Sequence, residues 1–193
     1  MTKALGIIQA EHGGHAAVLQ HLDNLARDIE VKGNAPDFVL VHLIVAYIRE
    51  FLDRFHHPKE DAYLFKALSK RCPEAIPMLD ALAVEHETGP LLLGALERAL
   101  KDFEMKGSIA YLPFRDSVRS YVAFERAHMM REETEVLPRA REMLTKEDWE
   151  VIDAVFTVNE DPIFGAVVQE RFRKLFATIV ELAPTTYARG PAL

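Results

Sequence analysis

The sequence has little of what several protein classes require. Its only cysteine is Cys72, so no disulfide can form within the chain. No apolar run approaches the length of about 20 residues that a membrane-spanning helix needs, so we expect no membrane contact. Residues 1–6 lack the basic and then apolar order of a signal peptide, which favours a cytoplasmic location.

Basic residues are also too few for a typical nucleic-acid-binding protein. Lys and Arg number 23 against 30 Asp and Glu, which gives a formal net charge of −7. This sign opposes binding to a phosphate backbone, so nucleic acid is not an expected partner. The sequence also lacks a Ser, Cys or Lys nucleophile motif and a glycine-rich phosphate loop, so we assign no catalytic residue of those kinds.

The sequence does contain long helical patterns. Its 193 residues, of which 49% are hydrophobic, are enough to bury one core. Breaker residues and apolar spacings of three and four predict four long helices. These helices are expected at roughly residues 4–31, 37–69, 74–106 and 109–143. The predicted fold class is therefore all-α, with one bundle domain over residues 1–143.

Residues 144–193 are expected to form a helical extension of the bundle. Thr145, followed by Asp148, has the pattern of a helix N-cap, and a last helix should follow Pro162. The apolar positions of this last helix either cover the side of the bundle or pair with a second subunit, which leaves a homodimer open. These positions are Phe164, Val167, Val168, Phe172, Leu175, Phe176, Ile179 and Leu182.

Histidine and glutamate residues interrupt the apolar faces of all four predicted helices. A buried imidazole or carboxylate costs roughly several kcal/mol unless it is paired, hydrogen-bonded or bound to a metal. The convergence of such residues therefore predicts a metal centre. The candidate ligands are His12, His15, His56, Glu60, His86, His128 and Glu132.

The second and fourth predicted helices carry the same motif. His56 with Glu60, and His128 with Glu132, both have the order His-x-x-x-Glu, with a basic residue before the glutamate and an acidic residue after it. Residues at this spacing share one side of a helix, so each pair offers a nitrogen and an oxygen to the same site. A two-metal site follows, in which the glutamates bridge both ions. These ligands suit iron, manganese or zinc and do not choose among them.

Further residues are assigned to the surroundings of this site. His15 lies one turn from His12, so it either ligates a metal, alone or with His12, or hydrogen-bonds to His12. Glu125 is expected to orient a ligand histidine. Tyr63 and Tyr121 fit two roles, as core aromatic residues or as hydrogen-bond donors near the ligands.

Four other polar residues lie off the inward-facing stripes. His57 and Asp61 have the four-residue spacing of the ligand pairs, but they lie on a neighbouring polar stripe. We therefore interpret them as surface residues or as supports for the ligands. His21 and His42 also lie off the stripes and are expected to be solvated.

The segments that carry the candidate ligands resemble the metal-binding segments of hemerythrin-like proteins, the HHE cation-binding family. The matching strings are AEHGGH, FHHPKEDAYLF, VEHETG and AHMMREETEVLP, in the family's order over about residues 7–140. The resemblance implies an up-and-down four-helix bundle around two non-haem iron ions joined by an oxo or hydroxo bridge, with manganese or zinc as substitutes. The ligands it implies are His12, His56, Glu60, His86, His128 and Glu132.

Two departures from the oxygen-carrying members bear on function. Those members have a second histidine one turn after the third-helix ligand, where Pro90 stands here, and they end in an aspartate five residues after a histidine, where Glu132 follows His128 by four. The pattern is closer to the bacterial branch linked to nitric oxide, peroxide and iron-centre repair. The resemblance therefore implies binding of, or reaction with, oxygen, nitric oxide or peroxide in sensing, scavenging or redox protection. A non-enzymatic module that binds, stores or donates iron is the alternative.

Overall fold

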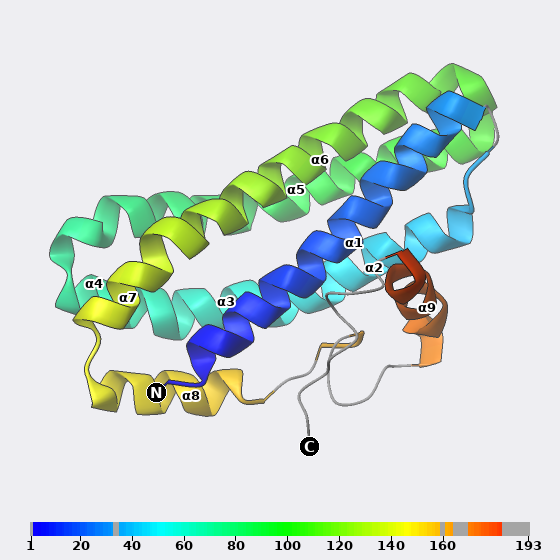
Figure 1. The fold of residues 1–193 in the computed structure, drawn as a ribbon. Coiled ribbons are helices and arrows are strands. Elements are labelled where there is room, and N and C mark those ends of the chain that lie inside the picture. Colours follow the sequence, from blue (N-terminus) through cyan, green and yellow to red (C-terminus); the bar gives the residue numbers. More distant parts are fainter. Residues whose placement is uncertain (1, 33–34, 159–160, 164–169, 183–193) are drawn as a thin grey trace.

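The computed structural model describes residues 2–32, 35–158, 161–163 and 170–182 of the chain. Helices joined by short connections make up this part of the protein, and it contains no strand. The predicted all-α class is therefore confirmed. Four long helical rods form the bulk of the molecule (Figure 1).

Each predicted helix corresponds to one rod. The first rod is α1 (Ala4–Lys32) and the third is α5 (Ile76–Lys106), which continues through Pro90. The other two rods are each interrupted by π-helical turns. The second comprises α2 (Phe38–Phe51), a π-helical turn (Leu52–His56), α3 (His57–Lys59), a second π-helical turn (Glu60–Phe65) and α4 (Lys66–Arg71). The fourth comprises α6 (Tyr111–Arg131), a π-helical turn (Glu132–Val136) and α7 (Leu137–Met143).

The rods form an up-and-down bundle. Both α1 and α5 pack against α2 and α6, and short connections reverse the chain between successive rods (Figure 1). A 3₁₀ turn (Pro73–Ala75) precedes α5, and another (Gly107–Ala110) follows it. Gly107 has a φ of +62°, a left-handed conformation that glycine adopts without steric cost, and this allows the sharp turn into α6.

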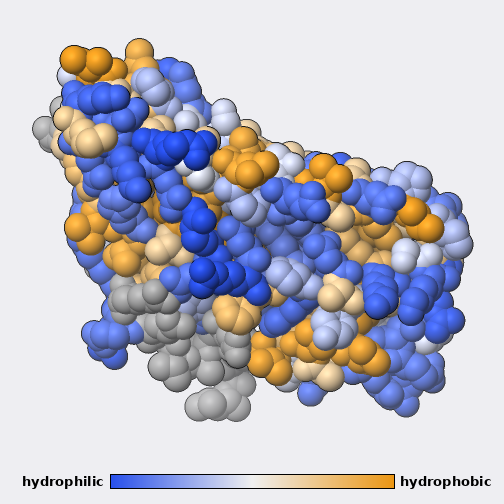
Figure 2. Space-filling model, turned by 180° about the vertical axis from the view of Figure 1, so that it is seen from behind, coloured by the Kyte–Doolittle hydropathy of each residue, from blue (hydrophilic) through white to orange (hydrophobic). Residues whose placement is uncertain are grey.

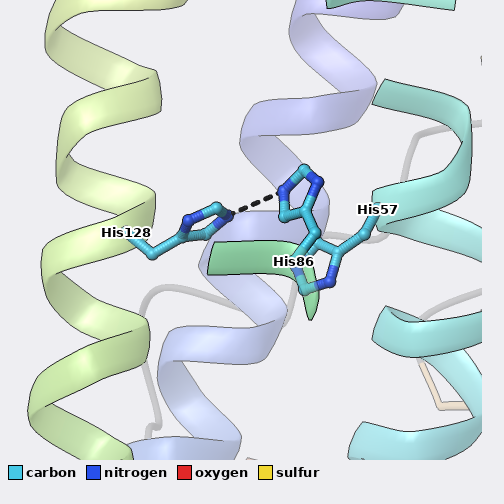
Figure 3. A group of neighbouring side chains, drawn as sticks. All are labelled: His57, His86 and His128. Atoms are coloured by element: carbon cyan, nitrogen blue, oxygen red, sulfur yellow. Dashed lines mark hydrogen bonds between the residues drawn. The ribbon is translucent and has the colours of Figure 1, made fainter. Parts of the chain in front are cut away.

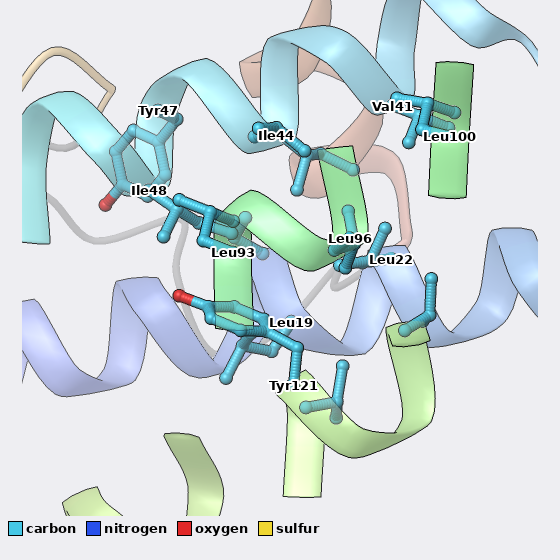
Figure 4. Close-up of a cluster of buried hydrophobic side chains, with 14 of the residues drawn as sticks. Leu19, Leu22, Val41, Ile44, Tyr47, Ile48, Leu93, Leu96, Leu100 and Tyr121 are labelled. Atoms are coloured by element: carbon cyan, nitrogen blue, oxygen red, sulfur yellow. The ribbon is translucent and has the colours of Figure 1, made fainter. Parts of the chain in front are cut away.

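Buried apolar side chains form two separate clusters along the bundle. The larger cluster fills the half that contains the end of α1, most of α2, the second half of α5 and the first half of α6 (Figure 4). The smaller cluster packs the start of α1 against α4, the start of α5, α7 and α8 (Lys146–Phe156). Between the two clusters, the inward positions are occupied by polar side chains.

The C-terminal extension contacts the bundle, first through α8. Thr145 and Asp148 form the predicted capping box at the start of α8. From the same helix, Asp153 accepts hydrogen bonds from the backbone N–H groups of Lys3 (2.9 Å) and Ala4 (2.7 Å), and so caps the start of α1.

The last helix lies along the side of the bundle. A 3₁₀ turn (Glu170–Phe172) leads into α9 (Arg173–Leu182), which packs against α1 and α2. Phe172 and Leu175 are buried in the larger apolar cluster. Of the other apolar positions expected in this helix, Phe164, Val167 and Val168 lie outside the described residues.

The surface mixes polar and apolar side chains. On the face opposite to the view of Figure 1, apolar side chains are scattered among polar ones (Figure 2). Within the described residues, no helix combines the length and the apolar character that a membrane crossing requires.

Candidate metal centre

Potential metal-binding side chains from all four rods meet between the two apolar clusters. Their ligand atoms form two groups, and within each group all atoms lie within 4.8 Å of one another. Every residue of both groups is buried. The first group is His12, His56, Glu60 and Glu132, and the second is His57, His86 and His128 (Figure 3).

Glu60 and Glu132 lie at the centre of the site and reach both groups. The carboxylate of Glu60 lies 3.5 Å from Nε2 of His56 and 3.7 Å from Nε2 of His86. The carboxylate of Glu132 lies 3.3 Å from Nε2 of His12 and 3.4 Å from Nε2 of His128. With exposures of 0% and 1%, neither glutamate can be solvated from outside. Each glutamate therefore lies close to histidines of both groups.

In each group, two histidines point their Nε2 atoms at one another. The two Nε2 atoms are 3.1 Å apart in the pair of His12 and His56, and 3.0 Å apart in the pair of His86 and His128. Figure 3 shows the second pair, with the rings reaching toward each other from α5 and α6. Each pair thus presents two nitrogen atoms to the same small volume.

The other ring nitrogen of each of these four histidines meets a carboxylate. An ionised carboxylate only accepts hydrogen bonds, so Nδ1 carries a proton, and Nε2 is the ring nitrogen that would bind a metal once it holds no proton. The Nδ1 atoms donate as follows: His12 to Glu133 (2.9 Å), His56 to Glu11 (2.8 Å), His86 to Asp61 (2.9 Å) and His128 to Glu85 (2.9 Å).

Sequence reasoning did not assign Glu11, Glu85 and Glu133 to the site, and it gave Asp61 as a surface residue or a support for the ligands, although the sequence carries a signal for all four. Each one is the direct neighbour of a predicted ligand: Glu11 precedes His12, and Asp61 follows Glu60. The bond in each case goes to a histidine on a different rod. Which histidine each acid would meet depends on packing, so adjacency alone could not assign the pairs.

Three π-helical turns surround the ligands of the second and fourth rods. His56 ends the turn Leu52–His56, Glu60 begins the next turn, and Glu132 begins the turn Glu132–Val136. A π turn contains more residues than an α turn, and such turns often occur at functional sites. The residues beyond each turn therefore face directions that a regular helical period does not predict.

His57 is the residue for which this difference matters most. His57 was expected either at the surface or as a support for the ligands, and the structure contradicts the surface position, because it places His57 in the second group with an exposure of 5%. Its ring stacks on that of His86, with centroids 4.2 Å apart, as Figure 3 shows. Nδ1 of His57 is buried and has no hydrogen-bond partner among the described residues.

His15 lies outside both groups of ligand atoms. Its ring is fully buried, and its Nε2 atom is 3.3 Å from Oε2 of Glu125. Glu125 therefore pairs with His15, whereas the sequence suggested that it orients a ligand histidine. Tyr121 is buried beside Glu125, and burial together with the Glu125 charge raises the pKa of its hydroxyl well above the usual value.

The other aromatic and histidine candidates have separate positions. Tyr63 is 39% exposed, which contradicts a place for it in the core. The expectation that His21 is solvated is also wrong, since its exposure is 5%. His42 is exposed, as expected, and its Nε2 lies 2.8 Å from Glu104.

Burial and neighbouring charges shift the pKa values of the glutamates and histidines in the site. Burial, and then the neighbouring Glu132 charge, raise the pKa of Glu60 well above its usual value. Burial also raises the pKa of Glu132, but the imidazoles around it outweigh this effect and hold the pKa well below its usual value. Burial lowers the pKa values of His12 and His86, yet the adjacent carboxylates outweigh burial and raise each to about 9. The protein alone thus holds protons where a cation would fit.

The donor set fits the binding of transition-metal cations. All four carboxylate oxygens of Glu60 and Glu132 are buried without a hydrogen-bond partner in the described part of the chain. Buried polar atoms are normally satisfied, so these oxygens require another partner. Five imidazoles and two carboxylates form a mixed nitrogen and oxygen set of the kind that binds iron, manganese or zinc.

Comparison with protein families agrees with this geometry. The model of the hemerythrin HHE cation binding domain matches residues 3–140, which include every residue of both groups. The chain belongs to this family. Neither the curated proteins nor the solved structures gave a significant match to it.

Membership of the hemerythrin HHE family makes the protein a cation-binding one. The four-rod bundle and its central histidine and glutamate groups are the structural basis of that property. This hemerythrin HHE domain departs from the family's oxygen carriers at Pro90, and His57 brings a histidine to the second group from another rod.

Proposed function

We propose that this hemerythrin HHE domain holds two iron ions and that these ions bind or react with a small oxidant: oxygen, nitric oxide or peroxide. The observation that carries the proposal is the division of the donors. One group contains three imidazoles and the other contains two, while Glu60 and Glu132 contact histidines of both groups. Two bound iron ions would supply one electron each to such an oxidant.

The division of donors favours one side of the site for the oxidant. Pro90 removes a histidine from the third rod, but His57 restores the number around His86 and His128. The smaller number of imidazoles therefore falls on the side of His12 and His56. We propose that the external molecule binds on this side, where fewer protein donors compete for the metal.

The chain's own residues prepare the site in two ways. The apolar clusters on either side exclude bulk water, which strengthens electrostatic interactions within the site. The outer carboxylates hold the protons of the ligand histidines on Nδ1, so that each Nε2 faces inward.

A module that stores or donates iron is the second candidate, and one observation favours it. The outer carboxylates Asp61, Glu85 and Glu133 are partly exposed, although the histidines that they contact are buried. Iron could therefore be exchanged through the surface at these carboxylates. Fast transfer of iron to a chelator, without reaction with oxidants, is expected of such a module.

One experiment distinguishes the two functions. Metal analysis of the iron-supplemented protein should give about two iron ions per chain, and a single tight metal or zinc alone would contradict the proposal. The reduced protein is then mixed with oxygen, nitric oxide and peroxide in a stopped-flow spectrometer. We expect rapid conversion to a stable di-ferric state. Reversible uptake of oxygen that is released under vacuum would instead indicate an oxygen carrier.

A further inference from the structure

A cleft with a volume of about 730 Å³ lies between the start of α1, the end of α7 and α8. In this part of the molecule α8 lies against the start of α1 (Figure 1). None of the residues that line the cleft belongs to either group of candidate metal ligands. Its volume falls within the range of about 300–1,000 Å³ that small-molecule sites have.

Three apolar side chains line the cleft. Leu5 and Leu144 are buried in the smaller apolar cluster, whereas Trp149 packs against that cluster and is only partly buried. The indole of Trp149 therefore has apolar surface that the packing of the described residues does not cover. An apolar group that covers this surface is stabilised by the removal of both from water.

Gly6 leaves the cleft open on the side of α1. A Cβ atom at this position would meet no atom within 4 Å, so the packing of the described residues does not require a glycine. The backbone does not require one either, because the φ of Gly6 is not positive. Since glycine destabilises a helix relative to alanine, its presence here leaves space in the cleft at a cost to the helix.

Most polar side chains of the lining have partners within the described residues. The pairs are Thr2 with Asp153 (2.6 Å), Gln9 with Glu133 (3.1 Å) and Lys146 with Glu150 (3.5 Å). Arg141 also lines the cleft, and its guanidinium forms no hydrogen bond or ion pair within the described part of the chain. The positive charge of Arg141 is therefore available to a ligand.

The charges of the cleft favour a ligand with a single negative charge. A guanidinium binds a carboxylate or a phosphate group through two parallel hydrogen bonds. The carboxylates of Glu150 and Asp153 also line the cleft, and they repel a second negative charge on the ligand. One carboxylate joined to an apolar body fits both the single free cation and the exposed indole.

We propose that this cleft is a binding site for a small amphipathic carboxylate. The carboxylate group pairs with Arg141, and the apolar body covers Trp149 and occupies the space beside Gly6. The inference goes beyond the proposed function, because it requires no reaction at the metal centre.

Octanoate is the probe, and Trp149 reports its binding. Trp149 is the only tryptophan of the chain, so its emission is specific to the cleft. The protein is loaded with zinc, whose filled d shell does not absorb the emission. We expect a saturable change in emission, and calorimetry should give the same dissociation constant. Octanol, which has no charge, should bind more weakly by about tenfold or more. Octyl phosphate, which carries two charges at about pH 8, should also bind more weakly than octanoate.

The first variant removes the charge. Arg141→Gln should weaken the binding of octanoate by about tenfold or more and leave the binding of octanol unchanged. Arg139→Gln is the matched control, since Arg139 lies on the same helix, pairs with Glu135 and does not line the cleft. This control should bind octanoate as the wild type does.

The second variant fills the cleft. In Gly6→Leu the new side chain occupies the space beside α1, so octanoate binding should be lost, whereas the Tm should not fall because leucine favours a helix. Gly94→Leu is the control. Gly94 lies in α5 and does not line the cleft, and a Cβ atom there would lie 3.5 Å from the side chain of Arg98, an ordinary contact. This variant should keep the wild-type affinity.

Each contrary outcome overturns a stated part of the proposal. Equal affinities for octanoate and octanol, or an unchanged octanoate affinity in Arg141→Gln, would show that Arg141 does not bind the ligand. Undiminished binding in Gly6→Leu would place the ligand outside the cleft. Tighter binding of octyl phosphate than of octanoate would overturn the carboxylate class. The absence of saturable binding by both fluorescence and calorimetry would overturn the site itself.

Discussion

The outer carboxylates set the properties of the individual ligand histidines. Three of them, Asp61, Glu85 and Glu133, are partly exposed. Glu85 forms an ion pair with Arg131, and Glu133 accepts a hydrogen bond from the side chain of Gln9. Glu11 differs, because it is buried and its Oε1 atom has no hydrogen-bond partner among the described residues.

Glu11 contacts one candidate ligand. It accepts a hydrogen bond from Nδ1 of His56, and both side chains are buried. A ligand histidine that donates to a carboxylate becomes a stronger donor to its metal. The two groups of candidate ligands therefore differ in the surroundings of their histidines as well as in the number of imidazoles.

The position of His57 gives a direct test of the second ligand group. His57→Ala should lower the iron content from about two ions to about one per chain, since the group would retain only His86 and His128. Metal analysis after exhaustive dialysis measures this. His21→Ala is the control, because His21 is equally buried and lies in neither group, so this variant should keep both ions. Full iron content in His57→Ala would show that His57 is not needed as a ligand.

Protons held by the metal-free site give a second test at the residue scale. Burial lowers the pKa values of His12 and His86, but the adjacent carboxylates raise each to about 9, so both imidazoles are protonated at pH 7. A metal must displace these protons, and its apparent affinity should rise as the pH increases toward 9.

Calorimetry in buffers of different ionisation enthalpy measures the number of protons released when the metal binds. We expect the protons of both imidazoles to appear in solution on metal binding at pH 7, and fewer protons at pH 9. An affinity that does not depend on pH between 7 and 9 would contradict this assignment of charge.

At the scale of the helices, apolar periodicity was sufficient to predict the rods. The first helix was expected at about residues 4–31 and is Ala4–Lys32, and the capping box of Thr145 and Asp148 forms where its pattern indicated. Both features depend on neighbours in sequence, which a single chain displays directly.

Periodicity was less reliable around the ligands. The stripes assumed a constant helical period, but π-helical turns end at His56 and begin at Glu60. For this reason His57, assigned to a polar stripe, is buried against His86, whereas Asp61 of the same stripe is exposed and accepts a hydrogen bond from His86. A stripe assigned with one constant helical period does not show where a π turn interrupts that period.

A mutation at the N-cap of α8 tests how much the cap contributes to stability. Thr145→Ala removes the side chain that accepts a hydrogen bond from the backbone N–H of Asp148, and it should lower the free energy of unfolding by about 1 kcal/mol. For a chain of this size, that corresponds to a fall in Tm of about 2–4 °C. Thr134→Ala serves as the control, since its exposed hydroxyl only bonds back to Met130 within the helix. Equal effects of the two variants would show that the cap contributes nothing.

At the scale of the whole molecule, the polar layers divide the hydrophobic core in two. The larger cluster is closed by α9, and the smaller one by α8. Each cluster contacts at least three rods, so each has its own apolar support. The region between them has few apolar contacts and depends on its polar partners.

This division predicts how the protein responds to loss of its metal. Without a cation, Glu60 and Glu132 are buried close together, and their oxygens have no hydrogen-bond partner within the described residues. Local opening of the π-helical turns that carry these glutamates should relieve the free-energy cost of burying them, while the two apolar clusters remain packed.

Hydrogen exchange followed by mass spectrometry tests this response. Chelation should increase exchange in Leu52–Phe65 and in the turn Glu132–Val136, whereas the segment around Leu96 in the larger cluster should stay protected. The Tm should fall at the same time, because the metal binds only the folded state. Uniform loss of protection over the whole chain would show instead that the metal holds the two clusters together and that neither is stable alone.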